Sequence, residues 1–210
     1  ERGCRSVTAA PHPRNPAGRT WREVLLWSLP ALVAGAVLRG LILSYLPHAT
    51  LRPDSDSYLS FAYRFLLDGD LSLYAKRRYT YPIALLPLSA LPGAPLRWIA
   101  WGQHLGGWLA VLPLAYLVRI VFARWRLWIV PITLVWALFP MAVWYEHEVL
   151  ADAPFALLFL TAIAGWTFWL RQRCTPAAWW AFFVPFALCV LTKPAGKFLW
   201  PALAVAFLVQ

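Results

Sequence analysis

Seven of the nine carboxylates in this chain fall within two segments that lie far apart in the sequence. They are Asp54, Asp56, Asp68 and Asp70 in the first segment and Glu146, Glu148 and Asp152 in the second. A carboxylate held in a cavity can take a proton from a reacting hydroxyl group, which is general base catalysis. Lysine and arginine side chains occur around the same segments, and cations stabilise negative charge that develops in a reaction. We therefore ask which elements would bring the two segments together.

The remainder of the chain is strongly apolar. Of its 210 residues, 61% are hydrophobic and 13% are charged, and the mean hydropathy is +0.59, which exceeds what a water-soluble domain of this length carries. The formal net charge is +10. With so little polar surface, we expect this charge to set membrane orientation and to contact anionic lipids rather than nucleic acid. The composition therefore predicts an integral membrane protein.

Five apolar runs are long enough to cross a bilayer, whose core requires about 20 residues of helix. These runs are residues 24–46, 98–118, 127–144, 154–170 and 177–191, and a sixth begins at Phe198. Because Gln210 stops inside the sixth run and Glu1 is not a Met, we expect a fragment of a longer protein. The predicted fold is an all-α, polytopic membrane helix bundle, with residues 1–22 as a basic cytoplasmic tail and residues 23–210 as the transmembrane domain.

The basic residues indicate the orientation, because cytoplasmic segments of membrane proteins are enriched in Lys and Arg. A cytoplasmic tail makes the turns around Arg124 and Arg171 cytoplasmic as well. Both acid-rich segments then lie on the external face. A group of acids and bases on one face of a chain that otherwise avoids charge is expected of a water-filled catalytic or binding cavity.

Residues 47–97 form the external loop predicted to carry the catalytic segment. Apolar residues recur there at helical spacing, which predicts an amphipathic juxtamembrane helix lying in the interface; they are Tyr58, Phe61, Ala62, Phe65 and Leu66. Asp68 and Gly69 are expected to end this helix, and Asp54 or Ser55 could cap its start by accepting a backbone N–H. Capping alone would account for Asp54, but it leaves Asp56 unexplained.

Several short motifs, taken in order, resemble those of the GT-C glycosyltransferases, and most closely the protein O-mannosyltransferase and lipid A aminoarabinose transferase group. The motifs are PDSDSY, FAYRFLLDGDL, YTYPIALLPL, EHEVLADAPFALL and LTKPAGKFLWPAL, and the likeness extends from Arg39 to Leu203. The resemblance implies a GT-C-like fold. It also implies a multi-pass protein of the bacterial inner membrane, with its active site on the periplasmic side.

The resemblance further implies an inverting glycosyltransferase, which moves a hexose or pentose from a polyprenyl-phosphate donor to a lipid, glycan or protein acceptor. The family's catalytic base corresponds to Asp54, and Asp56 stands beside it as a second catalytic candidate. An acid before the fourth span corresponds to Asp152, and the Lys before a Pro after the fifth span corresponds to Lys193. Residues expected to bind substrate are Asp152, Glu148, Tyr58, Lys76, Arg78, Lys193 and Arg39.

The basic residues in this set also have plainer explanations. Lys76 and Arg78 run against the positive-inside trend, so they could bind a substrate phosphate or contact lipid at the interface. Arg39 lies about 10 Å inside the first span at 1.5 Å per residue. Its side chain could extend to the interface or reach into the cavity. Lys193 stands at a helix end, where a long side chain can also snorkel.

The acids of the second segment leave alternatives open as well. Glu148 and Asp152 would share one face if the segment is helical, and they could bind acceptor or metal, face solvent, or begin a helix. His147 could join Asp56 at a divalent metal, the only cofactor considered. Residues 80–82 read TYP, where the aminoarabinose transferases carry an acid and a Lys. This departure argues against a metal site copied from them.

Two other functions are compatible with the same sequence. A transporter or flippase would use the same polar cavity to move a lipid or sugar without breaking a bond. Paired internal repeats with broken helices are typical of transporters, and the sequence shows no convincing repeat. The other alternative is a noncatalytic membrane subunit that binds lipid.

Overall fold

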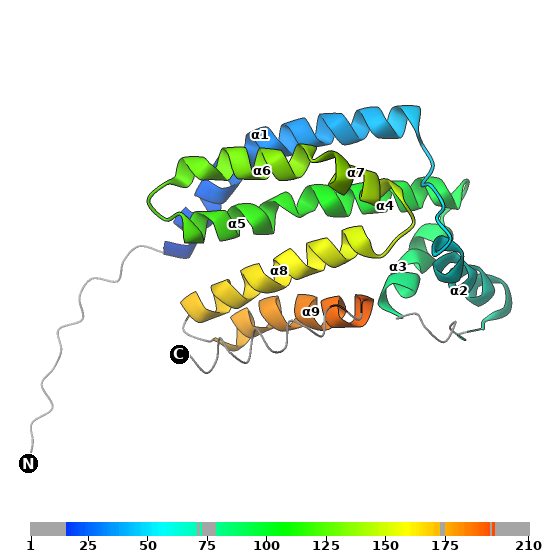
Figure 1. Cartoon of the computed structure of the whole chain (residues 1–210). Helices are drawn as coiled ribbons and strands as arrows, with labels where there is room; N and C mark the ends of the chain where they lie inside the picture. The colour runs from blue at the N-terminus through cyan, green and yellow to red at the C-terminus, as the bar shows by residue number, and fades with distance from the viewer. Residues whose placement is uncertain (1–15, 71, 73–78, 173–174, 194, 196–210) are drawn as a thin grey trace, which may run out of the picture.

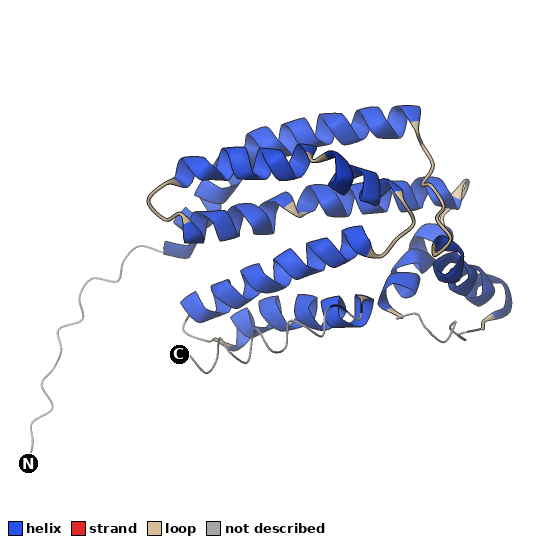
Figure 2. Cartoon of the chain, viewed as in Figure 1, coloured by secondary structure: helices blue, strands red, loops and turns tan. Residues whose placement is uncertain are grey.

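The computed structural model describes residues 16–70, 72, 79–172, 175–193 and 195, and these form helices joined by loops (Figure 2). The predicted all-α fold class is confirmed. In chain order the α-helices are α1 Pro16–Tyr45, α2 Ser55–Asp68, α3 Thr80–Ser89, α4 Pro95–Leu109, α5 Val111–Val121, α6 Ile129–Leu138, α7 Pro140–His147, α8 Asp152–Arg171 and α9 Pro176–Thr192, with a 3₁₀ turn at Arg126–Trp128.

Three helical stretches of the described chain are long and apolar enough to cross a membrane, which makes it a multi-pass membrane protein by length and composition. They are Thr20–Tyr45 in α1, Pro95–Val121, which joins α4 to α5, and Asp152–Arg171, which is α8. The three stretches run alongside one another through the bundle (Figure 1). Each matches one of the predicted spans.

The predicted span 127–144 is a broken helix rather than a straight one. Arg126–Leu138 and Pro140–His147 meet at an angle of 45°. The break lies at Phe139, which is extended with ψ 114°. A residue that precedes proline is driven out of the helical region by the proline ring, so Pro140 ends α6 and begins α7. This pair is a fourth span only if its two halves cross together.

The prediction of five complete spans is thus confirmed for three of them. The fifth run forms α9, a shorter apolar helix of 17 residues. Its start is well specified, because the Thr175 side chain accepts the backbone N–H of Ala178 and Pro176 occupies the first turn. The sixth run, from Phe198, lies outside the described residues. The same is true of the predicted tail up to residue 15, whereas α1 already begins at Pro16.

The helices of the bundle pack closely on one another and leave apolar side chains outside. α1 packs against α5 and α6, and α8 packs against α9 (Figure 1). The α8–α9 contact depends on Gly165, where a Cβ would lie 2.2 Å from the Ala181 carbonyl oxygen. Leu29, Val33 and Val37 of α1 are more than half exposed. Such an exterior is suited to lipid, because lipid chains replace water as the solvent for these side chains.

Helices α2 and α3 lie together at one end of the bundle (Figure 1). α2 ends as predicted at Gly69, which adopts φ 69° and donates its N–H to the Phe65 carbonyl. Glycine suits this left-handed position because it has no Cβ. The predicted capping by Asp54 is wrong: Asp54 occupies the N-cap position, but its side chain makes no capping hydrogen bond.

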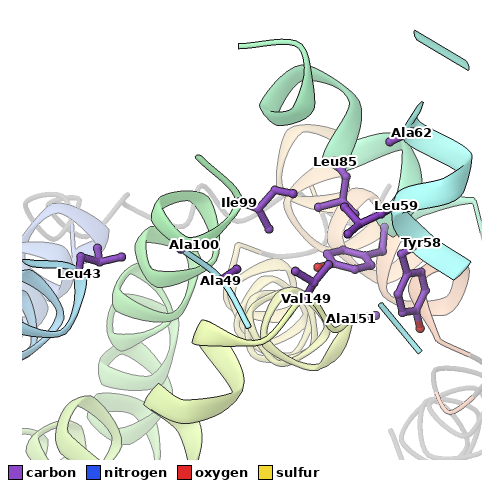
Figure 3. Close-up of a cluster of buried hydrophobic side chains, with 11 residues drawn as sticks. Leu43, Ala49, Tyr58, Leu59, Ala62, Leu85, Ile99, Ala100, Val149 and Ala151 are labelled. Atoms are coloured by element: carbon purple, nitrogen blue, oxygen red, sulfur yellow. The ribbon is translucent and has the colours of Figure 1, made fainter. Parts of the chain in front are cut away.

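A single apolar cluster joins this end of the bundle to the loops around it. It collects side chains from α1 and the loop after it, from α2, α3 and α4, and from the segment between α7 and α8 (Figure 3). The members drawn and labelled there are Leu43, Ala49, Tyr58, Leu59, Ala62, Leu85, Ile99, Ala100, Val149 and Ala151. Burial of this surface fixes α2 against the bundle, since apolar area removed from water is the main favourable term in packing.

Candidate functional site

The two acid-rich segments meet, as the sequence predicted. The backbone N–H of Thr50 donates to the His147 carbonyl at 2.8 Å, and the N–H of Val149 donates to the Thr50 carbonyl at 3.0 Å. These two bonds make an isolated parallel β-bridge between Thr50 and Glu148. The loop after α1 is therefore tied directly to the segment before α8.

Ser55 extends this junction to the start of α2. Its hydroxyl donates to the Val149 carbonyl at 2.9 Å and accepts the backbone N–H of Arg52 at 2.8 Å. Ser55 is fully buried. The serine therefore anchors the first turn of α2 to the second segment. It acts across the fold and not as the local N-cap that the sequence suggested.

An ion pair closes the same junction. The Arg52 Nε donates to the Glu148 Oε1 at 2.7 Å, and the Arg52 Nη2 contacts the same oxygen. Glu148 is 2% exposed, whereas the Arg52 side chain is 49% exposed. The hydrogen bond to Glu148, and then its negative charge, raise the pKa of Arg52 above the ordinary arginine value. Glu148, predicted to bind substrate, thus has Arg52 as its partner.

The two predicted catalytic acids are both exposed at the start of α2. Asp56 lines a pocket of about 510 Å³ between α2 and the start of α4. Arg52, Ser60 and Arg64 contribute to the same pocket. The Asp54 carbonyl accepts the Ser57 hydroxyl at 2.6 Å. Both carboxylates are therefore accessible at the end of the bundle where the two segments meet.

Tyr58, also predicted to bind substrate, belongs to the apolar cluster. It is 7% exposed, and its ring meets the Tyr81 ring edge-on with centroids 4.9 Å apart. In this position it packs α2 against α3 and is not open to a ligand. Lys76 and Arg78, the other two predicted ligands of this loop, lie outside the described residues.

Asp152 and Lys193 are brought together as an ion pair between Lys193 Nζ and Asp152 Oδ1. The Asp152 side chain is 43% exposed and the Lys193 side chain 27% exposed, so the pair faces solvent in part. Lys193 also lies 6.0 Å from the centre of the Phe155 ring. The predicted shared helical face of Glu148 and Asp152 is absent, because α8 begins at Asp152 and Glu148 is extended with ψ 141°.

Arg39 neither snorkels nor opens into a cavity; it forms a buried ion pair inside the bundle. Its Nε donates to the Glu146 Oε2 at 2.7 Å and its Nη2 to the Glu146 Oε1 at 2.5 Å. A third donor, Nη1, binds the Ala137 carbonyl at 2.9 Å. Arg39 is 4% exposed and Glu146 is 2% exposed. Arg39 is thus fully engaged by the protein, which argues against its predicted role in substrate binding.

His104 and His147 continue this network. The His104 Nδ1 lies 3.0 Å from the Glu146 Oε2, and the His104 Nε2 lies 3.1 Å from the His147 Nδ1. The two histidines are 1% and 2% exposed. Glu146 was predicted only as a member of the second acid-rich segment, and His104 was not predicted as a site residue. A signal for His104 was present, because an ionisable residue inside an apolar run is costly and is often functional.

Gln103 links the network to the junction. Its amide donates to the Glu146 carbonyl at 3.0 Å and to the Glu148 carbonyl at 2.6 Å, and its Oε1 accepts the Tyr81 hydroxyl at 2.6 Å. Burial raises the pKa of Tyr81 well above the ordinary tyrosine value, so its hydroxyl remains a donor. Gln103 was not predicted from the sequence either, because a single glutamine within a span has no distinctive spacing.

The predicted metal candidates do not come together. Asp56 lines the pocket beside α2, while His147 lines a separate pocket of about 300 Å³ between α1, α6 and α7. Within the ranges that the structure describes, no group of three or more His, Cys, Asp or Glu side chains is arranged to hold a metal ion. The two candidates therefore do not form a shared site, and a divalent metal remains a prediction.

Comparisons with known proteins found no matching family model, no similar curated protein and no similar solved structure.

Proposed function

We propose that this chain is the membrane domain of a GT-C-type inverting glycosyltransferase of the bacterial inner membrane. In this proposal a sugar passes from a polyprenyl-phosphate donor to an acceptor on the external face. The observation that carries the proposal is the β-bridge between Thr50 and Glu148. It ties the loop that bears Asp54 to the segment that leads into Asp152, as a shared site would require.

Asp54 is proposed as the general base. In the reaction, its carboxylate takes the proton of the acceptor hydroxyl while the oxygen attacks the anomeric carbon of the sugar. The new bond joins the acceptor oxygen to that carbon, and the bond from the carbon to the phosphate oxygen breaks. The exposure of Asp54 and Asp56 supports this role, because a base must reach its substrate. Asp56 is the alternative base.

The leaving group in this proposal is a lipid phosphate, and its growing negative charge needs a cation nearby. Among the described residues, Lys193 is suited to stabilise the negative charge of the leaving phosphate. Its ammonium group is partly exposed and is held by Asp152 at the start of α8. A carboxylate partner fixes a flexible lysine in one position, so that little side-chain freedom is lost when substrate binds. In this assignment Asp152 positions the lysine.

The test measures how fast the full-length protein in membranes transfers radiolabelled sugar from polyprenyl phosphate to an acceptor. Asp54→Asn should lower the rate by about 10²–10⁴-fold, the usual contribution of a general base. Asp68→Asn is the matched control, because Asp68 is an exposed acid at the other end of α2. It should leave the rate unchanged.

Full transfer by Asp54→Asn and by Asp56→Asn would overturn the proposal. Movement of intact lipid across the membrane, without release of the sugar, would indicate a transporter instead. Binding of polyprenyl phosphate without either process would indicate a noncatalytic subunit.

A further inference from the structure

The buried network of Arg39, Glu146, His104 and His147 takes no part in the proposed transfer. Its members come from α1, α4 and α7 and lie inside the bundle. Ionisable groups in this setting are expensive, because removal from water disfavours their charged forms. Their hydrogen bonds can be followed atom by atom, and they restrict where protons can be.

The protonation states of Glu146 and His104 follow from Arg39, which lies at one end of the network. The Arg39 guanidinium is always charged and only donates, and it binds both oxygens of Glu146. Glu146 is therefore a carboxylate, which only accepts. The His104 Nδ1, 3.0 Å from Glu146 Oε2, must then carry a hydrogen. This is the tautomer that a carboxylate partner selects in a histidine.

The remaining atoms then allow two states. If His104 is neutral, its Nε2 has no hydrogen and accepts from the Nδ1–H of His147, 3.1 Å away. The Nε2 of His147 is then a bare acceptor. It is buried and has no hydrogen-bond partner within the described part of the chain. A buried polar atom left in this condition costs free energy.

The addition of one proton changes this arrangement. The proton binds to Nε2 of His147, and the hydrogen on its Nδ1 passes to Nε2 of His104. The positive charge is then on the ring that contacts Glu146, where a carboxylate stabilises it. The ring of His147 also interacts with the backbone of His48. Within the protein only N–H bonds are made or broken, and the proton comes from hydronium, which leaves water.

We propose that Glu146, His104 and His147 form a buried proton-binding site that holds one exchangeable proton. The proposal is independent of the proposed transferase activity. Among the described residues, the charged and titratable groups around the site include Arg39 on α1, the Arg52–Glu148 pair of the junction, Tyr81, which acts through Gln103, and His48, whose backbone interacts with the His147 ring. The His147 carbonyl also holds Thr50. Proton binding therefore places charge on His104, which contacts His147, the residue that joins the loop after α1 to the bundle.

The experiment is ¹⁵N NMR of the full chain in lipid nanodiscs, with ¹⁵N-labelled histidine. The chain has four histidines, and His104→Gln, His147→Gln and His48→Asn assign the signals. Between about pH 5 and 8, where histidines change charge, His104 and His147 should take up one proton together. Above this transition, His147 should show hydrogen on Nδ1 and none on Nε2.

Glu146→Gln tests the carboxylate. Glutamine still accepts from His104 but has no charge, so proton affinity should fall at least tenfold, which lowers the transition by about one pH unit. The wild-type titration decides the matter if this variant does not fold. Separate transitions for His104 and His147, no proton uptake in this pH range, or hydrogen on Nε2 of His147 above the transition would overturn the proposal.

Discussion

Arg39 and Glu146 lie 107 positions apart in the chain and form a two-point ion pair in the interior of the bundle, with N–O distances of 2.7 and 2.5 Å. Both side chains are almost fully buried. The pair connects α1 to α7, two helices that the apolar pattern alone does not place together. A paired arrangement is required here, because a single buried charge would be far costlier than the pair.

Removal of one partner should therefore destabilise the protein strongly. Arg39→Met leaves Glu146 charged and unpaired except for His104, and the expected loss is about 3–5 kcal/mol. The double variant Arg39→Met/Glu146→Met replaces both charges by apolar side chains of similar length and should lose less. Unfolding of the purified protein in detergent measures both. If the double variant is less stable than Arg39→Met, the unpaired charge of Glu146 is not what destabilises the single variant.

Gly107 of α4 should be intolerant of any side chain. A Cβ at this position would lie 1.9 Å from the Glu146 Oε1. Gly107→Ala should therefore displace Glu146 and cost about 1–3 kcal/mol, as overpacking in a dense interior does. Gly106→Ala is the matched control, because a Cβ there meets only the Leu157 Cδ2 at 3.6 Å, an ordinary contact. Thermal unfolding of the purified protein should show Gly106→Ala to be at least as stable as wild type, because alanine favours the helix more than glycine does.

Much of this architecture could be predicted from the sequence, because long apolar runs have few alternatives to membrane helices. The convergence of the two acid-rich segments could be predicted as well, since helix parity put both on one face. Kinks are expected at the prolines of the spans, but the sequence does not single out Pro140, which follows the break at Phe139, from Pro30 and Pro185, which lie inside continuous helices. Membrane helices tolerate proline, so a proline marks a place where a bend is allowed but does not specify one.

The pairings within the site could not be predicted. Glu148 and Asp152 were grouped by their spacing, yet each is engaged by a base from another part of the chain, Arg52 or Lys193. Long-range partners depend on how helices are rotated against one another, which a single sequence does not encode in any local pattern. Spacing rules describe neighbours along a helix only.

Tyr81 provides a test that depends on pH. Its hydroxyl donates to Gln103 at 2.6 Å, and Tyr81→Phe should cost about 0.5–1.5 kcal/mol at neutral pH. Because burial raises the pKa of Tyr81 in the folded protein, its contribution is complete below the unfolded pKa of about 10 and falls as the pH rises above that value. Wild-type stability should therefore decline more steeply in alkali than that of Tyr81→Phe. Parallel curves from urea unfolding at several pH values would contradict this assignment.

The junction itself can be tested through Glu148. Its carboxylate holds Arg52, while the backbone on either side of it pairs with Thr50. Glu148→Gln keeps the size of the side chain but removes the charge that binds the guanidinium, so the loop should separate from the bundle more often. Hydrogen exchange at the amides of Thr50 and Val149 measures this opening, and both should exchange roughly tenfold faster than in wild type.

The control for this measurement is Asp70→Asn. Asp70 pairs with Arg64 at 3.6 Å near the other end of α2, and both side chains are more than a third exposed. Surface pairs of this kind contribute little, so exchange at Thr50 and Val149 should not change. Faster exchange in Asp70→Asn as well would mean that α2 loosens as a whole. Unchanged exchange in Glu148→Gln would mean that the two backbone hydrogen bonds and the Ser55 hydroxyl hold the junction without the ion pair.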